Sequence, residues 1–328
     1  VVVVGFGTQK KVNLTGAVST VSSKEIKERP VVNAVQALQG VVPGLRIFQE
    51  NGSLEDKPSI NVRGTTTIGE GSSGDPLILI DGMEGDLNSI NPQDIDNISV
   101  LKDAAASSIY GSRAPFGVIL VTTKSGNTEG KIRVNYNNNL RWSTPINLQH
   151  MMNSVDFASW YNDTHTNGGG SIFFNNEHMQ RIVAYHNAKP YGNGKRITAD
   201  GTILTNLPVA SDGVHWADKY DHGNDDVDWF GKIYKKWNFA HEHNLSVDGG
   251  SKKLNYYDSM NYMKQEGLMK LGNEALNRFT GTAKINSQIV DWMKFNYTMR
   301  FTREDFVRPS DLLEGMYANL VRQGLPTV

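Results

Sequence analysis

Alternating apolar and polar residues mark the second half of the chain, from about residue 131 onward. Between Ile132 and Trp142 the apolar side chains occupy one parity and Arg and Asn occupy the other, with Asn138 as the exception. Successive side chains of a β-strand point to opposite faces of the sheet. The segment is therefore predicted to be a strand with one apolar and one polar face.

Four later segments repeat this alternation, at residues 253–262, 278–286 and 293–302 and, more weakly, at 237–247. Strands of about 10–13 residues exceed the about five to six residues that soluble sheets usually contain. Short turns join the later segments, whereas roughly 95 residues separate the first strand from the second. Long alternating strands with short turns at one end and long loops at the other are typical of an outer-membrane β-barrel. A soluble β-sandwich with one wet face is the alternative.

The first part of the chain, up to about Lys124, has the pattern of a compact α/β domain. Short apolar runs at residues 60–62, 77–80, 95–101 and 118–123 predict buried strands. Apolar residues at helical spacing over 31–38 and an Ala-rich stretch over 103–110 predict short helices between them. Residues 22–26 predict a capped helical turn, and Asp81 with Gly82 predicts a turn after the strand at 77–80.

Composition adds limits to this picture. The chain has 328 residues, no cysteine and a formal net charge of -1 from 33 basic and 34 acidic side chains. The absence of cysteine excludes disulfides, thiol catalysis and zinc sites built on Cys. The balanced charge gives no reason to expect nucleic acid as a partner. No run of about 18 apolar residues is present, so no transmembrane helix is predicted, and the 32 Gly and 31 Asn favour strands and loops.

No constellation of residues predicts an enzyme, a cofactor or a metal site. His241 and His243 fall on one face of a strand, but the sequence shows no third ligand, and polar residues on a strand that faces the lumen need no metal. The oxygen-rich segment 223–228 lacks the spacing of an EF-hand, so a solvated loop is favoured over a calcium site. No phosphate loop, dinucleotide fingerprint or nucleophile–base–acid set is recognisable. The chain is therefore expected not to be an enzyme.

Six sequence blocks give the chain a resemblance to a known family. They are VVVVGFGTQKK at residues 1–11, VNAVQALQGVVPGLRI at 32–47, INVRG at 60–64, PLILIDGMEG at 76–85, ISVLKDAAASSIYGSRAPFGVILVTTKSG at 98–126 and HNLSVDGGSKKLNYYDSMNYMKQEG at 243–267. In this order they resemble the N-terminal portion of SusC-like (SusC/RagA family) TonB-dependent outer-membrane transporters. The chain departs from the family pattern at Pro115 and Phe116, where a small residue and Asn are more usual.

The resemblance implies an α/β plug domain followed by the first strands of a large transmembrane antiparallel β-barrel, with about 22 strands in the full protein. Residues 1–11 would be the TonB-box region and residues 12–126 the plug domain. Residues 127–328 would be the N-terminal part of the barrel, with about five strands and a long extracellular loop at about 144–236. Five strands cannot close a barrel, and an open sheet edge is not tolerated in lipid. The chain is therefore expected to be part of a longer protein.

The resemblance also implies a function, which is the TonB-dependent active import of oligosaccharides, or less often oligopeptides, across the outer membrane of a Gram-negative bacterium. The TonB-binding segment would be Val1, Val2, Val3 and Val4, because an extended strand can add to the sheet edge of a partner. TonB and its inner-membrane ExbB/ExbD motor would supply the work. A SusD-like surface lipoprotein would cover the barrel, and outer-membrane lipid would surround it.

Two other functions stay open at this point. One is a siderophore or cobalamin receptor of the same fold, and the other is a surface β-rich binding or adhesin protein without transport. Under the import reading, candidates for contact with the substrate are polar residues of a glycine-rich plug loop and aromatic residues of the long loop, namely Arg63, Thr65, Thr66, Trp160, Tyr161 and Trp216. Aromatic residues that only pin their own loop are the alternative for the last three.

Two further groups of side chains have candidate structural roles. Arg63 and Arg113 are candidates for ion pairs between plug and barrel, and a solvated surface arginine is an equal alternative for each. Four tryptophans near predicted strand ends could belong to an aromatic girdle at the membrane surface, with core packing as the alternative. They are Trp142, Trp229, Trp237 and Trp292.

Overall fold

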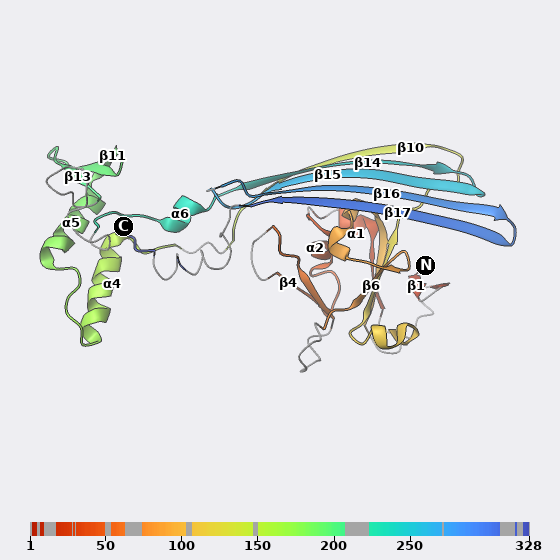
Figure 1. The fold of residues 1–328 in the computed structure, drawn as a ribbon, viewed down its shortest axis with the longest axis horizontal. Helices are drawn as coiled ribbons and strands as arrows, with labels where there is room; N and C mark the ends of the chain where they lie inside the picture. The colour runs from red at the N-terminus through yellow and green to blue at the C-terminus, as the bar shows by residue number, and fades with distance from the viewer. Residues whose placement is uncertain are drawn as a thin grey trace. The chain divides into compact units, whose positions relative to one another are not determined.

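The computed structural model describes residues 2–4, 7–9, 18–27, 29, 31–49, 54–62, 74–102, 107–146, 150–206, 223–270, 272–308, 319 and 324–327 (Figure 1). The chain divides into two compact units. The first unit comprises Val1–Ser143, Asn238–Gly267 and Ala275–Val307. The second comprises Thr144–Trp237, Leu268–Glu274 and Arg308–Val328.

A five-stranded sheet forms the centre of the plug, in the first unit. Its strands lie in the order β3 (Val18–Ser22), β8 (Ile95–Leu101), β9 (Val118–Thr123), β6 (Leu77–Ile80) and β7 (Met83–Glu84). The pair β6–β9 is parallel, and the other neighbours are antiparallel. Three of the four strands that the apolar runs predicted lie in this sheet. These three, β6, β8 and β9, are almost wholly buried, as expected for strands covered on both faces.

Short helices and a separate hairpin complete the plug. The helices are α1 (Ser23–Lys27) and α2 (Ala34–Leu38), the 3-10 turns are η2 (Leu87–Ser89), η3 (Pro92–Asp94) and η4 (Ser108–Arg113), and the hairpin pairs β4 (Leu45–Phe48) with β5 (Ser59–Val62). Helix α2 is shorter than the predicted 31–38, because the side chain of Asn33 accepts the N–H of Gln36 and caps the helix there. Part of the predicted helix at 103–110 lies outside the described residues, and the remainder is 3-10.

A small hairpin precedes the plug sheet. Strand β1 (Val2–Val4) pairs antiparallel with β2 (Gly7–Gln9), and these two strands form a sheet of their own. Val1 lies outside the described residues. The valine run therefore has the extended backbone that a strand requires.

A second five-stranded sheet contains the barrel strands. Its members are β10 (Arg133–Ser143), β14 (Asn238–Gly250), β15 (Leu254–Glu266), β16 (Ala275–Val290) and β17 (Met293–Val307), each antiparallel to the next. Tight turns join β14 to β15 and β16 to β17 at one end, which is named the short-turn end. Longer connections leave the other end, named the long-loop end, where β10 finishes and β14 begins. All five strands predicted from alternation are present.

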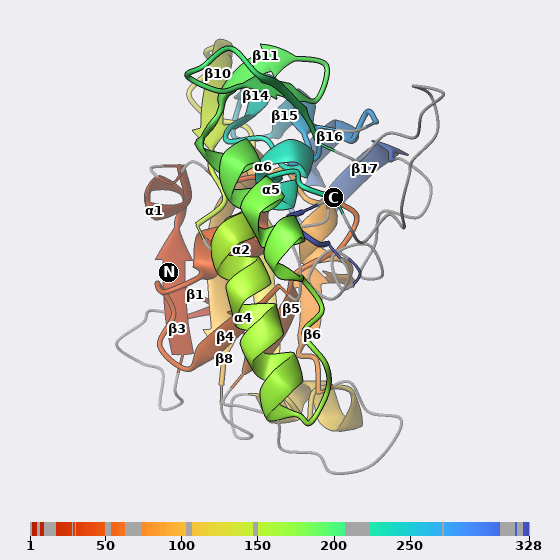
Figure 2. The same ribbon diagram turned by 90° about the vertical axis from the view of Figure 1, so that its left-hand side faces the viewer.

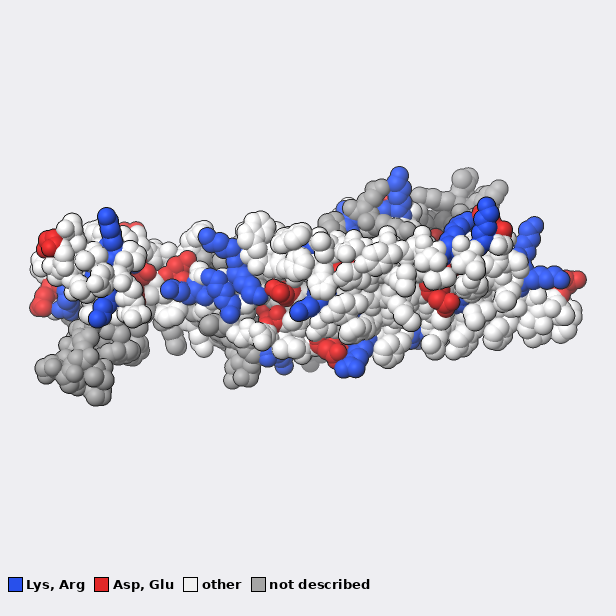
Figure 3. All heavy atoms as spheres, turned by 90° about the horizontal axis from the view of Figure 1, so that it is seen from above, with Lys and Arg blue, Asp and Glu red and all other residues white. Residues whose placement is uncertain are grey.

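The two faces of the barrel sheet differ as the alternation predicted. One face exposes apolar side chains such as Tyr136, Met260 and Phe301, and uncharged atoms dominate it in the view from above (Figure 3). The other face buries polar side chains such as Asn261 and Thr282 against the plug. None of the described helices is long and apolar enough to span a bilayer.

Two details of the strand prediction were wrong. His241 and His243 lie on the exposed apolar face and not on the face toward the lumen, because they share the parity of Leu245 and pair across the strands with Leu140 and Asn138. Trp229 does not lie at a strand end, since it begins a helix in the second unit.

The second unit contains ordered elements where the sequence predicted only a long loop. Helices α4 (Ser154–Asn167) and α5 (Asn176–Asn187) pack against each other around a small apolar cluster (Figure 2). A three-stranded sheet follows, formed by β11 (Lys189–Gly192), β12 (Lys195–Ile197) and β13 (Ile203–Thr205), and α6 (Trp229–Ile233) comes next in the chain. Both long helices begin with an Asn cap, at Asn153 and Asn175.

Distant segments of the chain meet in this unit. The N–H of Asp225 donates to the carbonyl of Thr327 at 2.9 Å, and the N–H of Val227 donates to the carbonyl of Pro326 at 2.8 Å. The indole of Trp229 donates to the carbonyl of Leu325 at 3.0 Å. Residues 324–327, which follow the fifth barrel strand in sequence, are therefore part of the same folded unit as the long insertion.

Candidate functional site

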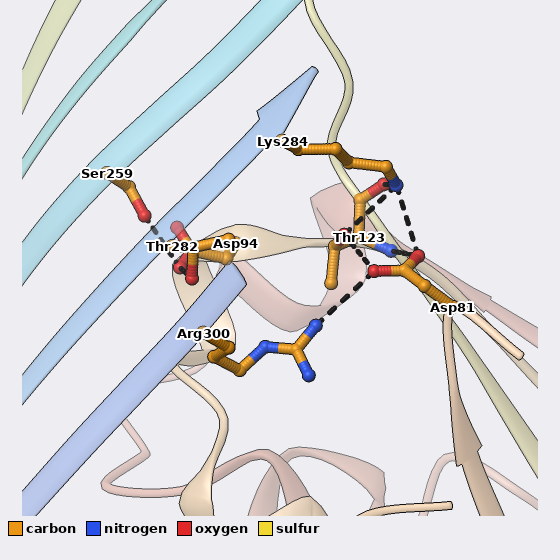
Figure 4. Close-up of polar contacts among 7 residues, drawn as sticks. All are labelled: Asp81, Asp94, Thr123, Ser259, Thr282, Lys284 and Arg300. Atoms are coloured by element: carbon orange, nitrogen blue, oxygen red, sulfur yellow. Dashed lines mark hydrogen bonds and ion pairs between the residues drawn. The ribbon is translucent and has the colours of Figure 1, made fainter. Parts of the chain in front are cut away.

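The contact between plug and barrel sheet is the most polar buried region of the first unit. Asp94, the last residue of η3, is 1% exposed. Its carboxylate accepts hydrogen bonds from three barrel hydroxyls, those of Tyr257 at 2.9 Å, Ser259 at 2.7 Å and Thr282 at 2.9 Å (Figure 4 shows the last two). A buried carboxylate is costly unless its lone pairs are satisfied, and here the barrel wall satisfies them.

A second plug carboxylate binds two barrel cations. Asp81 follows β6 in a turn with positive φ, a conformation that Asp tolerates. Its oxygens lie 3.1 Å from Nζ of Lys284 on β16 and 3.3 Å from Nη2 of Arg300 on β17 (Figure 4). The carboxylate also accepts the N–H of Thr123, the last residue of β9, at 2.9 Å. Asp81 therefore joins the plug sheet to two adjacent barrel strands.

Two buried barrel arginines hold the backbone of the segment before α2. Arg141 on β10 donates to the carbonyl of Val31 at 2.7 Å, and Arg278 on β16 donates to the carbonyl of Val32 at 2.7 Å. Arg278 is 2% exposed. Glu242 on β14 lies 3.4 Å from Arg141 and provides a carboxylate among these cations. Both guanidinium groups bind backbone carbonyls of the plug. These hydrogen bonds therefore do not require a particular plug side chain.

These contacts are spread along the length of the barrel strands. Arg141 lies close to Ser143, where β10 finishes at the long-loop end. Lys284 lies toward the opposite, short-turn end of β16. Between them, Asn91 donates to Asn244 at 2.8 Å and Thr302 donates to the carbonyl of Ser89 at 3.1 Å. The plug is therefore fastened at several levels.

The junction between plug and barrel fits only a glycine. A Cβ atom at Gly126 would overlap the backbone of Tyr256 and Gly249, so the chain passes directly against β14 and β15. The next residue, Asn127, donates to the Asp248 carboxylate at 2.7 Å and to the carbonyl of Lys131 at 2.8 Å. The C-terminal end of the plug is thus fixed at the short-turn end of the sheet.

This arrangement can hold the plug and still release it. The interface is formed by hydrogen bonds and ion pairs, which water can replace when the surfaces separate, so the net contribution of a typical bond is only about 0.5–1.5 kcal/mol. Separation would expose polar side chains such as Asn244 and Thr282, together with some apolar ones such as Met263.

The candidate substrate residues are only partly visible. Arg63, Thr65, Thr66 and Trp216 lie outside the described residues. Trp160 and Tyr161 are neighbours on α4, and the indole of Trp160 is 50% exposed.

The ring of Tyr161 packs inside the second unit, with centroid distances of 5.1 Å to Phe173 and 5.7 Å to Phe157. Tyr161 thus stabilises its own helix pair, and Trp160 has the surface on which a ring could stack. Contact of these residues with a substrate stays a prediction.

Of the two alternatives for Arg113, the structure agrees with an exposed surface arginine and not with an ion pair to the barrel. Arg113 pairs with Glu84 inside the plug, because η4 brings it next to the β6–β7 hairpin, and both side chains are exposed. Asp81 and Asp94 are the plug carboxylates that bind barrel side chains, and the sequence analysis did not predict these contacts. The sequence did contain an indication of these contacts. Lys284 and Arg300 occupy polar positions of β16 and β17 that would face the lumen, and no partner was assigned to either cation.

The oxygen-rich segment 223–228 uses its carboxylates within the second unit. Asp228 accepts the N–H of Gly231 at 3.1 Å and caps α6. Asp226 accepts the N–H of Ser154 at 2.9 Å and contacts Nδ1 of His186 at 2.8 Å. Within the described part of the chain no cluster of three or more His, Cys, Asp or Glu could hold a metal ion.

Two partly buried acidic groups outside the membrane strands, Asp226 and Asp86, have perturbed pKa values. Burial acts to raise the pKa of Asp226, but the hydrogen bonds from Ser154 and His186 outweigh it and leave the pKa lowered. Burial acts in the same direction on Asp86 of the plug, where hydrogen bonds from Lys57 and the N–H of Asn88 lower the pKa. Both carboxylates are therefore ionised at neutral pH and stabilise their surroundings as anions.

Comparison with known proteins agrees with this architecture. The family model described as TonB-dependent Receptor Plug Domain matches residues 10–118. The TonB-dependent receptor SusC of Bacteroides thetaiotaomicron is 28% identical over 314 residues, which cover 92% of this chain and 26% of that protein. The chain is a SusC-like TonB-dependent receptor.

Two further proteins are similar to this SusC-like chain over most of its length. TonB-dependent receptor P3 of Formosa agariphila is 32% identical over 295 residues, covering 90% of the chain and 24% of that receptor. The RagAB peptide importer in its open-open state has a TM-score of 0.70 and 28% identity, covering 94% of this chain and 33% of that one. The chain thus spans about a quarter of the length of these curated relatives. The predicted plug followed by strands of an outer-membrane β-barrel is confirmed, and the outer membrane is its location.

Proposed function

We propose that the full-length protein imports oligosaccharides or oligopeptides across the outer membrane in a TonB-dependent manner. The observation that carries the proposal is the polar contact between plug and barrel, in which Asp81 and Asp94 bind barrel side chains. This contact closes the barrel at rest and can be broken by work. The RagAB relative is a peptide importer, which supports a cargo of oligomer size.

The work would enter through the valine-rich N-terminus. Strand β1 pairs with β2 in a sheet that contains, among the described residues, only these two strands. The backbone of β1 is thus already extended, and an extended segment can pair with the sheet edge of a partner such as TonB. Val1, Val2, Val3 and Val4 are the proposed contact, and the ExbB/ExbD motor would supply the force.

A SusD-like lipoprotein is the proposed partner on the outer side. The second unit contains an ordered helix pair in the insertion between β10 and β14, and this connection leaves the long-loop end of the sheet. In outer-membrane barrels the long loops face the exterior. The helix pair belongs to this connection, which supports contact with a surface partner and with cargo, and Trp160, Tyr161 and Trp216 are the proposed aromatic contacts.

One substitution pair tests the TonB contact. Val3→Pro removes a backbone N–H and blocks strand addition, whereas Val3→Thr keeps a β-branched side chain and the N–H. We expect Val3→Pro to abolish uptake of cargo and to leave folding and cargo binding intact, and Val3→Thr to retain uptake. Uptake by the Val3→Pro strain equal to that of the parent would contradict the proposal. Growth on the cargo and binding to the purified full-length protein provide the two measurements.

A further inference from the structure

A cavity of about 630 Å³ opens between Arg29, α2 and the β4–β5 hairpin of the plug. Its volume falls within the about 300–1,000 Å³ of ligand sites in proteins. Three glutamine side chains, Gln36, Gln39 and Gln49, line it together with Phe48 and Arg29. The plug–barrel hydrogen bonds and ion pairs described above use the side chains of none of these five residues, so the composition of the cavity calls for another explanation.

The cavity lies near the long-loop end of the barrel sheet. Val31 also lines the cavity, and its carbonyl accepts a hydrogen bond from Arg141. Arg141 lies close to Ser143 at the long-loop end of β10. The long loops of outer-membrane barrels face the cell exterior. A ligand that enters the barrel from outside would therefore reach this cavity before the plug moves.

The lining residues match a hydroxyl-rich ring with a negative charge. A glutamine amide has both a donor and an acceptor, as a sugar hydroxyl requires. The oxygen of Gln36 already accepts the N–H of Val32 at 3.3 Å, so Gln36 would offer its NH2 group. The ring of Phe48 is 59% exposed and can cover the apolar face of a sugar. None of the described residues that line the cavity is acidic, so the one charged side chain, Arg29, sets a preference for anions.

Arg29 is held in place by the backbone of the plug. Its Nη1 donates to the carbonyl of Gln39 at 2.6 Å and to that of Ala37 at 3.5 Å, at the C-terminal end of α2. Among the described residues neither Nε nor Nη2 of Arg29 has a hydrogen-bond partner. A guanidinium fixed by one nitrogen presents its remaining N–H groups in the planar arrangement that binds a carboxylate or sulfate.

We infer that this cavity binds an acidic sugar of the cargo, with the sugar ring against Phe48 and its carboxylate or sulfate at Arg29. The inference rests on the proposed import function and narrows its cargo to an anionic oligosaccharide. A peptide could place only its carboxylate terminus at Arg29, and it has no hydroxyl-rich ring for the glutamine amides and Phe48 to bind. The glutamine amides would then select among sugars by the positions of their hydroxyls.

Growth of a strain that carries the full-length protein as its only importer of this class tests the cargo. The carbon sources are polygalacturonate and chondroitin sulfate fragments as acidic glycans, starch and galactan fragments as neutral glycans, and a casein digest as peptides. We expect growth that depends on the importer only on an acidic glycan. Dependence on a neutral glycan or on peptide overturns the inference and leaves import intact. If growth does not depend on the importer with any of these carbon sources, the result contradicts the import function itself.

Two variants then test the cavity with the acidic glycan that supports growth. Calorimetry on the purified full-length protein should show a Kd at least about tenfold higher for Phe48→Ala and for Arg29→Gln. Met83→Ala and Arg113→Gln are matched controls, because Met83 is 58% exposed and Arg113 pairs with Glu84, both outside the cavity. Loss of Arg29 also removes bonds to α2, so Phe48→Ala separates binding from stability. An unchanged Kd for Phe48→Ala overturns the inference.

Discussion

Replacing Asp81 by Asn should weaken the binding of the plug to the barrel sheet. The substitution removes the negative charge that pairs with Lys284 and Arg300. The carboxylate of Asp81 lies 3.1 Å from Lys284 and 3.3 Å from Arg300, and the three side chains are 10%, 11% and 17% exposed. Asn at this position keeps the size of the side chain and an acceptor for Thr123. Both cations would then remain nearly buried without their carboxylate.

The size of the effect follows from this burial. Removing one partner of a buried ion pair costs about 3–5 kcal/mol. The lower end applies here, because some exposure remains and Lys284 still donates to the carbonyl and hydroxyl of Thr123, each at 3.2 Å. A loss of about 3 kcal/mol raises the equilibrium constant for plug release by about a hundredfold.

Hydrogen exchange of the full-length protein in lipid nanodiscs measures this release. Amides of β9 that exchange only when the plug leaves the barrel should lose up to about a hundredfold of protection in Asp81→Asn. The matched control is Asp86→Asn, because the pair of Asp86 with Lys57 is exposed and is worth at most about 1 kcal/mol. In a background with both Lys284→Met and Arg300→Met, Asp81→Asn should cost far less. Two results would refute the role of Asp81. One is an equal loss of protection for Asp81→Asn and Asp86→Asn, and the other is an equal effect of Asp81→Asn with and without the two Met substitutions.

Three other predictions concern different parts of the chain. Tyr297→Arg, on the exposed apolar face, should destabilise the folded barrel by about 2–4 kcal/mol if it lies near the bilayer midplane; urea unfolding in liposomes checks this, and a larger loss for Asn296→Arg would mean that the faces are reversed. Gly126→Ala should lower the yield of correctly folded protein, since its Cβ has no space against Tyr256, and a normal yield of heat-modifiable barrel on gels would argue against that close approach. Asp226, whose pKa is lowered on folding, should stabilise the second unit fully above the ordinary Asp pKa of about 3.9, and this stability should fall as the pH drops through the lower pKa of the folded state. Pepsin should therefore cleave near α4 faster at pH 3 than at pH 5, after correction for its own activity, and an Asp226→Asn variant that retained the same pH difference would count against this role.

The sequence was most informative where side-chain parity alone determines the structure. The barrel strands were predicted because alternation over residues such as Ile132 to Trp142 is a direct consequence of strand geometry. Each strand continues past the C-terminal end of its prediction, because pairing with a neighbour maintains the sheet where alternation has ended. In β17, for example, pairing continues to Val307 opposite Ala275.

Local patterns were least informative about partners distant in sequence. Asp81 was predicted as a turn residue, which it is, but its contact with Lys284 and Arg300 depends on how the plug lies against the barrel. The helix pair α4–α5 was missed, because its apolar positions are few and the Asn caps at 153 and 175 also suit loops. Family resemblance identified the domains, whereas the contacts between them required the structure.

The pairing of Ser143 with Asn238 has a consequence for how such receptors diversify. These two residues are cross-strand neighbours, so the whole segment from Thr144 to Trp237 leaves the sheet and returns to it at adjacent points. The entropy of closing a connection grows by only about 0.6 kcal/mol for each doubling of its length. Inserting a segment of this size in place of a tight turn therefore adds a closure cost of about 3 kcal/mol at most. We expect that the insertion can be shortened, lengthened or exchanged with the register of β10 and β14 retained, so that the outward-facing region can evolve independently of the membrane strands.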